Sequence, residues 1–298
     1  MSVRAALRIA VWGLGLIGGS LAAALKERAG PPRVVGIDRE EVIRRALEVG
    51  LIARGHTVED FREGVRDADL LVLATPLEVI LEVLERIGPF LRPGTLVTDV
   101  GSTKQRIVET ARTYLPGGIT FIGGHPMTGS ERRGLAAADA HLFEDAVWVL
   151  TPDPTVPEAP LRMLTGVIEG VGARVVLEEP ARHDRIVARI SHLPQILAVA
   201  LMNRVGRWHG EDDRTLRLAA GGFRDLTRIA ASPWEIWAGI HATNGEAIRE
   251  ALDAFIRELL EVRERLEGYG LEGDFIQAAR WRRLMPSSGE RDARRDGV

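Results

Sequence analysis

The stretch LRIAVWGLGLIGGS, residues 7–20, decides the fold of this chain. It joins a short apolar run, Leu7–Trp12, to a turn with glycine at positions 13, 15 and 18, and a helical pattern follows at Ser20–Arg28. Glycines at this spacing permit a tight turn. They also let phosphates approach the N-terminus of the next helix, where free N–H groups and the helix dipole favour anions. The stretch therefore predicts the opening strand, turn and helix of a dinucleotide-binding domain.

An acidic residue follows this turn at the sequence spacing typical of dinucleotide-binding domains. Asp38 ends the next predicted strand, Arg33–Asp38, twenty positions after Gly18. A carboxylate there accepts hydrogen bonds from a ribose diol and repels a 2′-phosphate, which favours NAD over NADP. The neighbouring Arg39 keeps NADP as an alternative cofactor, because an arginine at this place can pair with the 2′-phosphate. The expected cofactor-binding residues are Gly13, Gly15, Leu16, Ile17, Gly18, Asp38, Arg39, Thr75, Pro76 and Ser102.

Strand and helix patterns alternate over the first 180 residues. Further apolar runs, predicted as buried strands, are Asp69–Ala74, Thr95–Asp99, Thr120–Gly124, Ala146–Leu150 and Ala173–Leu177. Helical segments separate most of them, including Glu40–Val49, Leu77–Leu91 and Lys104–Tyr114. This alternation predicts right-handed βαβ units and hence an α/β fold with a Rossmann-type, doubly wound parallel sheet.

The pattern changes after Pro180. Apolar residues recur at helical spacing, as at Ile186, Ile190, Leu193 and Leu197, and no strand pattern remains. We expect a dinucleotide-binding domain over 1–180, an all-helical substrate and dimerisation domain over 181–285, and a disordered tail over 286–298. The wide apolar faces of the predicted helices indicate a homodimer.

Composition excludes several classes of function. The chain has 298 residues, a net charge of −3 and no cysteine. Balanced charge argues against nucleic-acid binding, and the absence of cysteine excludes disulfides and thiolate chemistry. The longest uncharged run, Val11–Leu25, is too short and too rich in glycine to span a bilayer, and no signal peptide pattern opens the chain. We expect a cytoplasmic enzyme without a metal ion.

Polar residues gather where the predicted strands end. Thr75-Pro76 follows one strand, Ser102 follows the next, and His125 follows a third. Doubly wound sheets bind ligands at this carboxyl edge. A histidine there can accept a proton from a substrate hydroxyl near neutral pH. In the helical half, Arg224 and Arg228 are candidate carboxylate clamps.

Five motifs in order resemble the prephenate/arogenate dehydrogenase family of tyrosine biosynthesis. The resemblance runs from Leu7 to Leu284. The motifs are GLGLIGGS (13–20), DVGSTK (99–104), GGHPMTGSE (123–131), H-D-x-x-x-A-x-x-S-H-L-P (183–194) and GFRDLTRIA (222–230), the last followed by Trp237.

This resemblance implies NAD-dependent oxidative decarboxylation of prephenate to 4-hydroxyphenylpyruvate, or of arogenate to tyrosine. It implies that His125 is the catalytic histidine and that Ser102 orients it. Arg228 would bind a substrate carboxylate. The remaining substrate-binding positions implied are Trp237, Glu131, His192 and Gln195.

One position departs from the family pattern. Many members have a histidine where this chain has Gln195, close to the substrate side chain. Glutamine cannot be cationic, so the choice between prephenate and arogenate stays open, as does inhibition by tyrosine.

The sequence also allows two other interpretations of the protein's function. A β-hydroxyacid dehydrogenase or imine reductase would carry a catalytic lysine or aspartate on the first long helix of its second domain, and 182–200 contains no lysine. An NAD-sensing binding module would keep the glycine turn and Asp38 without needing His125 and Arg228.

Overall fold

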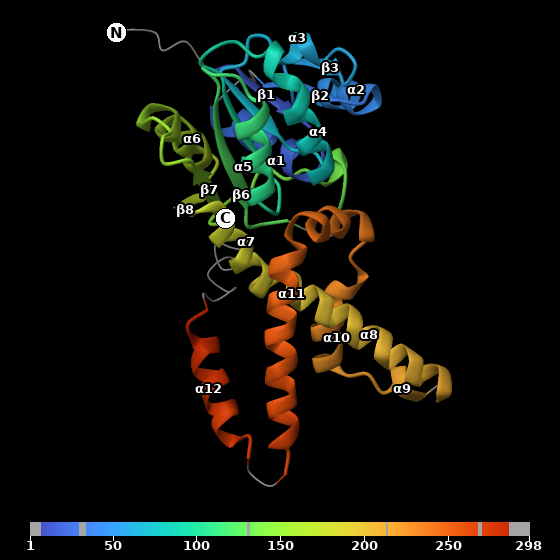
Figure 1. Ribbon diagram of the computed structural model, residues 1–298. Helices are drawn as coiled ribbons and strands as arrows, with labels where there is room; N and C mark the ends of the chain where they lie inside the picture. Colours follow the sequence, from blue (N-terminus) through green and yellow to red (C-terminus); the bar gives the residue numbers. More distant parts are fainter. Residues whose placement is uncertain (1–6, 30–33, 130–131, 213, 268–269, 286–298) are drawn as a thin grey trace. The chain divides into compact units, whose positions relative to one another are not determined.

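The computed structural model describes residues 7–29, 34–129, 132–212, 214–267 and 270–285 (Figure 1). By the contacts within it, the chain divides into two compact units, residues 1–245 and 246–298. The first contains the sheet, its covering helices and the helices up to Gly245. The predicted domain boundary near Pro180 stays a prediction, and the predicted disordered tail lies outside the described residues.

The first unit is built on one eight-stranded sheet with the order β3-β2-β1-β4-β5-β6-β7-β8. Every neighbouring pair is parallel except β6 and β7. The strands are β1 (Ile9–Trp12), β2 (Val34–Asp38), β3 (Arg54–Thr57), β4 (Leu70–Leu73), β5 (Leu96–Asp99), β6 (Thr120–Pro126), β7 (Val147–Pro152) and β8 (Arg174–Leu177). The expected α/β fold with a Rossmann-type sheet is thus confirmed.

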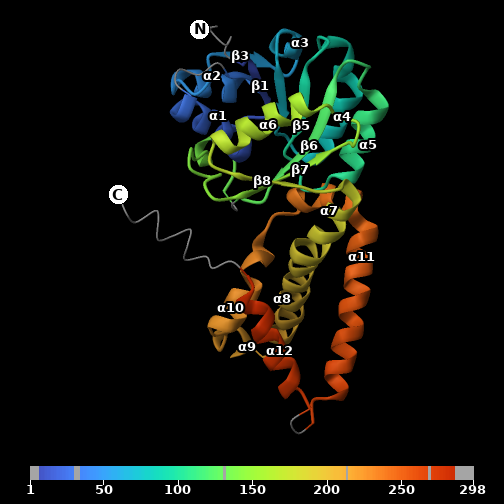
Figure 2. The same cartoon turned by 90° about the vertical axis from the view of Figure 1, so that its left-hand side faces the viewer.

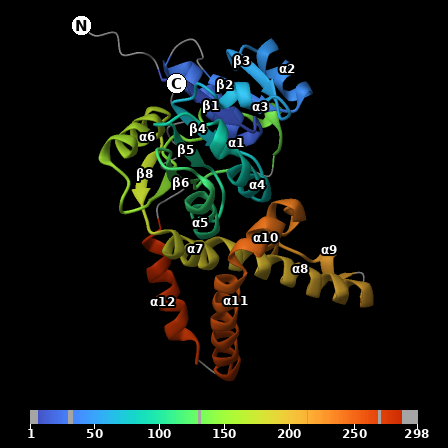
Figure 3. The same ribbon diagram turned by 45° about the horizontal axis from the view of Figure 1, so that its top comes forward.

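Helices cover both faces of this sheet, as the alternation along β1 demonstrates. Ile9 and Val11 join one buried apolar cluster, and Ala10 and Trp12 join another. Helix α4 lies beside α5 (Figure 2), and α6 lies beside β8 (Figure 3). The helices of this part are α1 (Leu16–Ala29), α2 (Glu40–Glu48), α3 (Phe61–Val65), α4 (Leu77–Ile87), α5 (Gln105–Tyr114) and α6 (Glu158–Gly170), with short 3₁₀ turns η1 (Gly88–Phe90) and η2 (Leu135–Ala137).

Three details differ from the sequence expectation. Strand β3, with the sequence RGHT, was not predicted, because it is a partly exposed edge strand without an apolar run. Strand β6 extends to Pro126, so His125 lies within the strand instead of following it. Strand β7 runs antiparallel to β6. The connection between them carries only η2, so the chain re-enters the sheet from the edge it has just left.

The described residues after Pro180 form helices and no strand, as expected. Pro194 does not end the helix that contains it. A π-helical turn, η3 (Ala188–His192), precedes α8, and π turns are frequent at functional sites. These elements are α7 (Pro180–Val187), η3, α8 (Leu193–Glu211), α9 (Arg214–Arg217), α10 (Gly221–Thr227), the 3₁₀ turn η4 (Arg228–Ala231), α11 (Trp234–Glu264) and α12 (Glu272–Arg283).

Helix α11 is interrupted at Asn244, whose backbone angles of −130° and 18° are not helical. The second unit contains the part of α11 after Gly245 and α12. An ion pair of 2.6 Å joins Arg265 to Asp274 within it. Its exposed apolar side chains include Ile256, Leu259, Leu260, Phe275, Ile276 and Trp281.

The helix over Pro180–Glu211 is long and apolar enough, by length and composition, to cross a membrane. The core helix of a soluble protein passes the same test. This helix carries His183, Asp184 and His192, which are buried against polar partners described below.

Candidate active site

The glycine turn lies at the carboxyl edge of the sheet, packed closely against the end of β4. Gly13 has φ of 97°, and a Cβ atom there would lie 2.5 Å from the Ala74 carbonyl oxygen. A Cβ at Gly18 would lie 1.9 Å from the carbonyl oxygen of Gly13. A Cβ at Gly15 would meet nothing within 4 Å. The first and third glycines are therefore required for packing, while the second leaves open space in front of α1, where a pyrophosphate would approach.

Asp38, at the end of β2, is held against this turn by backbone N–H groups. Leu14 N donates to its Oδ2 at 2.6 Å, and Arg39 N donates to its Oδ1 at 2.7 Å. The side chain is 18% exposed, so its oxygens can still accept from a ribose diol. The Arg39 guanidinium is 73% exposed and pairs with Glu41 at 3.1 Å. The end of β2 and the start of α2 thus carry the carboxylates of Asp38 and Glu41, with the Arg39 guanidinium beside them.

A further polar atom lies unpaired beside the turn. Thr75 Oγ1 is buried and has no hydrogen-bond partner among the described residues. Thr75 follows β4, and Pro76 precedes α4. The unpaired hydroxyl of Thr75, the fixed carboxylate of Asp38 and the open space at the N-terminus of α1 together fit a bound dinucleotide.

A buried ion pair fixes the strand that carries the candidate catalytic histidine. Lys104 and Asp99 are both fully buried and paired. Lys104 Nζ also donates to the Gly124 carbonyl oxygen at 2.7 Å, and Gly124 N donates to Asp99 Oδ1 at 3.0 Å. Burial lowers the pKa of Lys104, and the Asp99 carboxylate opposes that shift. This pair joins the end of β5 to the residue before His125.

His125 is half-buried and contacts a second histidine. Its Nδ1 lies 2.9 Å from His183 Nε2, with the rings 5.1 Å apart and nearly perpendicular. His183 Nδ1 in turn lies 2.8 Å from Asp184 Oδ1. Burial lowers the pKa of His125 well below its ordinary value, and the neighbouring His183, Lys104 and His192 lower it further. His125 is therefore neutral near pH 7, as a proton acceptor must be.

His192, the rival candidate base, is placed differently. Asn244 Nδ2 donates to the backbone oxygen of Asp184 at 2.9 Å and lies 3.2 Å from His192 Nδ1. Because this amide nitrogen is a donor, His192 Nδ1 must accept, and the ring proton lies on Nε2. His192 therefore presents a donor where a general base needs a lone pair.

The burial of His192 predicts acid sensitivity of the fold. Burial lowers the pKa of His192 from 6.5 to about 4. Below pH 6.5 the unfolded chain takes up a proton that the folded chain does not, so stability falls as the pH drops from 6.5 to about 4. The full contribution is about 3 kcal/mol, at 1.36 kcal/mol per pKa unit. Urea unfolding across this range should show a shallower loss of stability in His192→Gln than in the wild type. Equal slopes would contradict this assignment.

The remaining predicted site residues are brought only partly together. Gln195 is buried, and its Nε2 donates to the Ile229 carbonyl oxygen at 3.0 Å, next to Arg228. The Trp237 ring lies edge-to-face with His192 at 6.0 Å. Arg228 is exposed at the start of η4, with no acidic partner in the part of the chain that the structure describes. Ser102 is half-buried and makes no hydrogen bond to His125 within the described residues. Glu131 lies outside them.

Three residues of the site were not assigned roles from the sequence. His183 and Asp184 belong to a motif that the resemblance uses, and Asn244 follows Trp237. Their contact with His125 and His192 depends on α7 and α11 meeting the sheet edge, which no local pattern reveals. The one signal was the adjacent pair His183-Asp184 in the sequence PARHDRIV.

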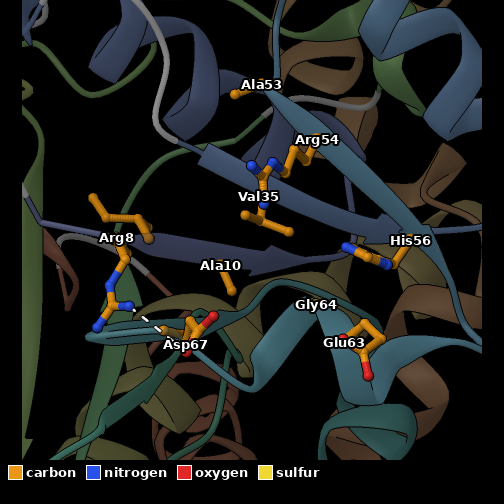
Figure 4. Close-up of a pocket in the computed structure, with 11 residues that line it drawn as sticks. Arg8, Ala10, Val35, Ala53, Arg54, His56, Glu63, Gly64 and Asp67 are labelled. Carbon is orange, nitrogen blue, oxygen red and sulfur yellow. Dashed lines mark ion pairs between the residues drawn. The ribbon is translucent and has the colours of Figure 1, made fainter.

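A separate cavity of about 320 Å³ lies at the opposite, amino edge of the sheet (Figure 4). Arg8, Arg54 and His56 line it together with Glu63 and Asp67. Arg8 is paired with Asp67 there. This cavity lies away from the glycine turn and is not part of the candidate active site.

Comparison with known proteins identifies the family. Residues 21–177 match the model of the prephenate dehydrogenase nucleotide-binding domain, and residues 179–278 match that of the prephenate dehydrogenase dimerization domain. Prephenate dehydrogenase of Bacillus subtilis is 38% identical over 88% of this chain and 71% of its own length. Cyclohexadienyl dehydrogenase of Zymomonas mobilis is 34% identical over 90% of both chains.

Solved structures of similar proteins point to the same family. Prephenate dehydrogenase from Aquifex aeolicus, in complex with hydroxyphenyl propionate and NAD⁺, superposes with a TM-score of 0.82 at 26% identity, covering 95% of this chain and 99% of that one. Arogenate dehydrogenase from Synechocystis superposes with a TM-score of 0.75 at 33% identity, covering 96% and 99%. Two family models matched along most of the chain, and relatives this similar, mean that the chain belongs to the prephenate/arogenate dehydrogenase family.

Proposed function

We propose that this protein is an NAD-dependent prephenate dehydrogenase, which converts prephenate to 4-hydroxyphenylpyruvate and CO₂. The observation that carries the proposal is the position of half-buried His125 in β6, at the same sheet edge as the glycine turn, where burial lowers its pKa. A proton acceptor beside a dinucleotide site is what the removal of hydride from a carbinol carbon requires. The relatives' names supply the substrate.

The proposed chemistry divides between cofactor and protein. NAD, when bound, accepts the hydride from the ring carbinol carbon. His125 takes the proton of the ring hydroxyl. The ring then loses its carboxylate as CO₂, the electrons of the broken carbon–carbon bond make the ring aromatic, and His125 returns the proton to the resulting phenolate oxygen. Aromatisation drives the reaction, so the protein mainly positions the substrate and manages this proton.

The substrate-binding residues follow from their positions and from the family resemblance. Arg228, with no acidic partner among the described residues, would pair with a substrate carboxylate. His192 would offer its Nε2 proton to the substrate, and Trp237 would form an apolar wall beside it. Gln195 contributes no charge beside the substrate side chain, and the proposed roles of Glu131 and Ser102 rest on the resemblance alone.

Asp38 should set the choice of cofactor. Its carboxylate lies at the place of a 2′-phosphate, so we expect NAD to be used more efficiently than NADP. Asp38→Ser removes the repulsion while Arg39 stays adjacent, so the ratio of kcat/KM for NAD to that for NADP should fall. The measurement is kcat/KM for both cofactors in wild type and variant, with Arg39→Ala as the matched control. A wild-type preference for NADP would refute this role of Asp38.

We further propose that the protein is a cytoplasmic homodimer formed through its helical part. The support is the dimerization-domain model matched by residues 179–278 and the exposed apolar side chains of α11 and α12. A monomer at micromolar concentration in light scattering would contradict the dimer.

The experiment that tests the proposed function compares prephenate with arogenate, each with NAD and with NADP, in steady-state assays. We expect the highest kcat/KM for prephenate with NAD. If arogenate were the better substrate, the protein would be an arogenate dehydrogenase. This is the second candidate, because the chain is similar to the arogenate dehydrogenase from Synechocystis. No reduced cofactor with either substrate would overturn the proposal.

A further inference from the structure

We propose that His183 and Asp184 are positioning residues that fix the proton of His125 on Nδ1 and so leave Nε2 as the base. The proposal rests on the proposed function for the identity of the reaction, but the position of a ring proton can be measured without it. The observation behind it is the chain of contacts Asp184–His183–His125, with distances of 2.8 and 2.9 Å.

The surroundings of Asp184 determine the first proton. Its carboxylate is buried and faces donors only. Lys104 N donates to Oδ1 at 2.7 Å, and Gln105 N donates to Oδ2 at 2.9 Å, both at the start of α5. A carboxylate in these contacts is an acceptor. His183 Nδ1, 2.8 Å from Oδ1, must therefore carry a proton.

The proton on His183 Nδ1 determines which nitrogen of His125 carries its proton. If His183 carries one proton, and that proton is on Nδ1, its Nε2 holds a lone pair. That atom lies 2.9 Å from His125 Nδ1, so His125 Nδ1 must donate. In a neutral His125 the remaining nitrogen, Nε2, then holds the lone pair that a general base needs. The opposite tautomer would place two lone pairs against each other.

The charged groups around these rings favour this arrangement. Lys104, just before α5, and His192, in η3, both disfavour a second proton on His125, and Asp99 on β5 is paired with Lys104. When Nε2 takes the substrate proton, the O–H bond breaks and an N–H bond forms. His125 is then cationic and still donates through Nδ1 to His183. Asp184 at the far end stabilises that charge, as the carboxylate does in a serine-protease triad.

Local structure holds the two residues in place. The Glu179 side chain caps α7 by accepting from Ala181 N at 2.9 Å and Arg182 N at 2.8 Å, and Pro180 occupies the first helical turn. At the other side Asn244 donates to the Asp184 backbone oxygen. The beginning of α7 is thus fixed from both sides, which a positioning role requires.

The direct test is the tautomer of His125, read by nitrogen NMR of protein labelled at its histidine rings. The seven histidines can be assigned by single substitutions. We expect His125 to carry its proton on Nδ1 and His183 to carry its proton on Nδ1. A proton on Nε2 of His125 in active wild-type protein would overturn the proposal. Active protein is the condition that separates this failure from a failure of the proposed function, which would appear as no dehydrogenase activity.

A matched pair of variants tests the effect on turnover. In His183→Gln the amide oxygen can lie where Nε2 was and accept from His125. In His183→Asn the shorter amide can reach Asp184 but not His125. We expect His183→Asn to lose roughly 10–10²-fold in kcat, by analogy with the loss seen when the hydrogen-bond partner of a metal-binding histidine is removed. His183→Gln should recover much of this loss and keep the His125 proton on Nδ1, with KM little changed in both variants.

The control is His141→Gln, which changes an exposed histidine paired with Glu144 and should leave kcat unchanged. Equal losses in His183→Gln and His183→Asn, or losses in KM alone, would mean that His183 only supports the fold.

Discussion

Replacing His125 by alanine is expected to lower kcat by about 10²–10⁴-fold, the usual contribution of a positioned general base. The fold should stay intact, because the His125 side chain is only half-buried, its backbone stays paired with Val149 of β7, and the Lys104–Asp99 pair holds the preceding residue. The affinity for NAD should change little, since the glycine turn and Asp38 do not contact His125. The measurements are kcat, the dissociation constant of NAD, and a circular dichroism spectrum.

His125→Asn separates binding from proton transfer. The amide can keep a hydrogen bond to the substrate but cannot take its proton, so this variant should recover KM more than kcat. Activity of the wild type should fall on acidification, because only neutral His125 accepts a proton. Since its pKa is lowered well below 6.5, this loss in the free enzyme should lie below pH 6.5. If His125→Ala kept a near-normal kcat and an unchanged pH profile while His192→Ala lost activity and its pH dependence, the role of general base would pass to His192.

Replacing Arg228 by alanine is expected to raise KM for the substrate, because the substrate carboxylate loses a charge-assisted partner. By analogy with truncated buried charge pairs, the loss is roughly 2–5 kcal/mol, which corresponds to a factor of about 30 or more. The exposed guanidinium, free of any acidic partner in the described ranges, is available for such a ligand. The affinity for NAD should not change.

Arg224→Ala is the matched control for this prediction, since Arg224 is an exposed arginine on the adjacent helix α10. It should leave KM close to the wild-type value. An unchanged KM in Arg228→Ala together with a raised KM in Arg224→Ala would assign the clamp to Arg224.

The parts of the fold that local patterns encode were predictable from the sequence. The glycine turn, Asp38 and the buried strands carry signals in the residues themselves, because packing and phosphate access restrict which side chains fit. Strand β3 carries no such signal, since its residues Arg54–Thr57 are partly exposed and pair with β2 only through backbone groups. The direction of β7 depends on how the chain returns after Pro126, which periodicity does not encode.

The sequence proposes members of the candidate site but does not specify their contacts. His125 and Arg228 are proposed from sequence position and family resemblance. The partner of His125 was expected to be Ser102, whereas the ring contact in the structure is with His183, 58 residues away along the chain. That contact exists because α7 packs against α5 at the carboxyl edge of the sheet. Such a contact between distant elements follows from tertiary packing, and the sequence around either histidine does not specify it.

The measurement that tests the central claim most directly is the stoichiometry of products from prephenate and NAD, in wild type and His125→Ala side by side. The account predicts equal amounts of NADH, CO₂ and 4-hydroxyphenylpyruvate from the wild type, with the rate of all three reduced together in the variant. NADH formation without CO₂ release, or equal rates in the two proteins, would contradict it.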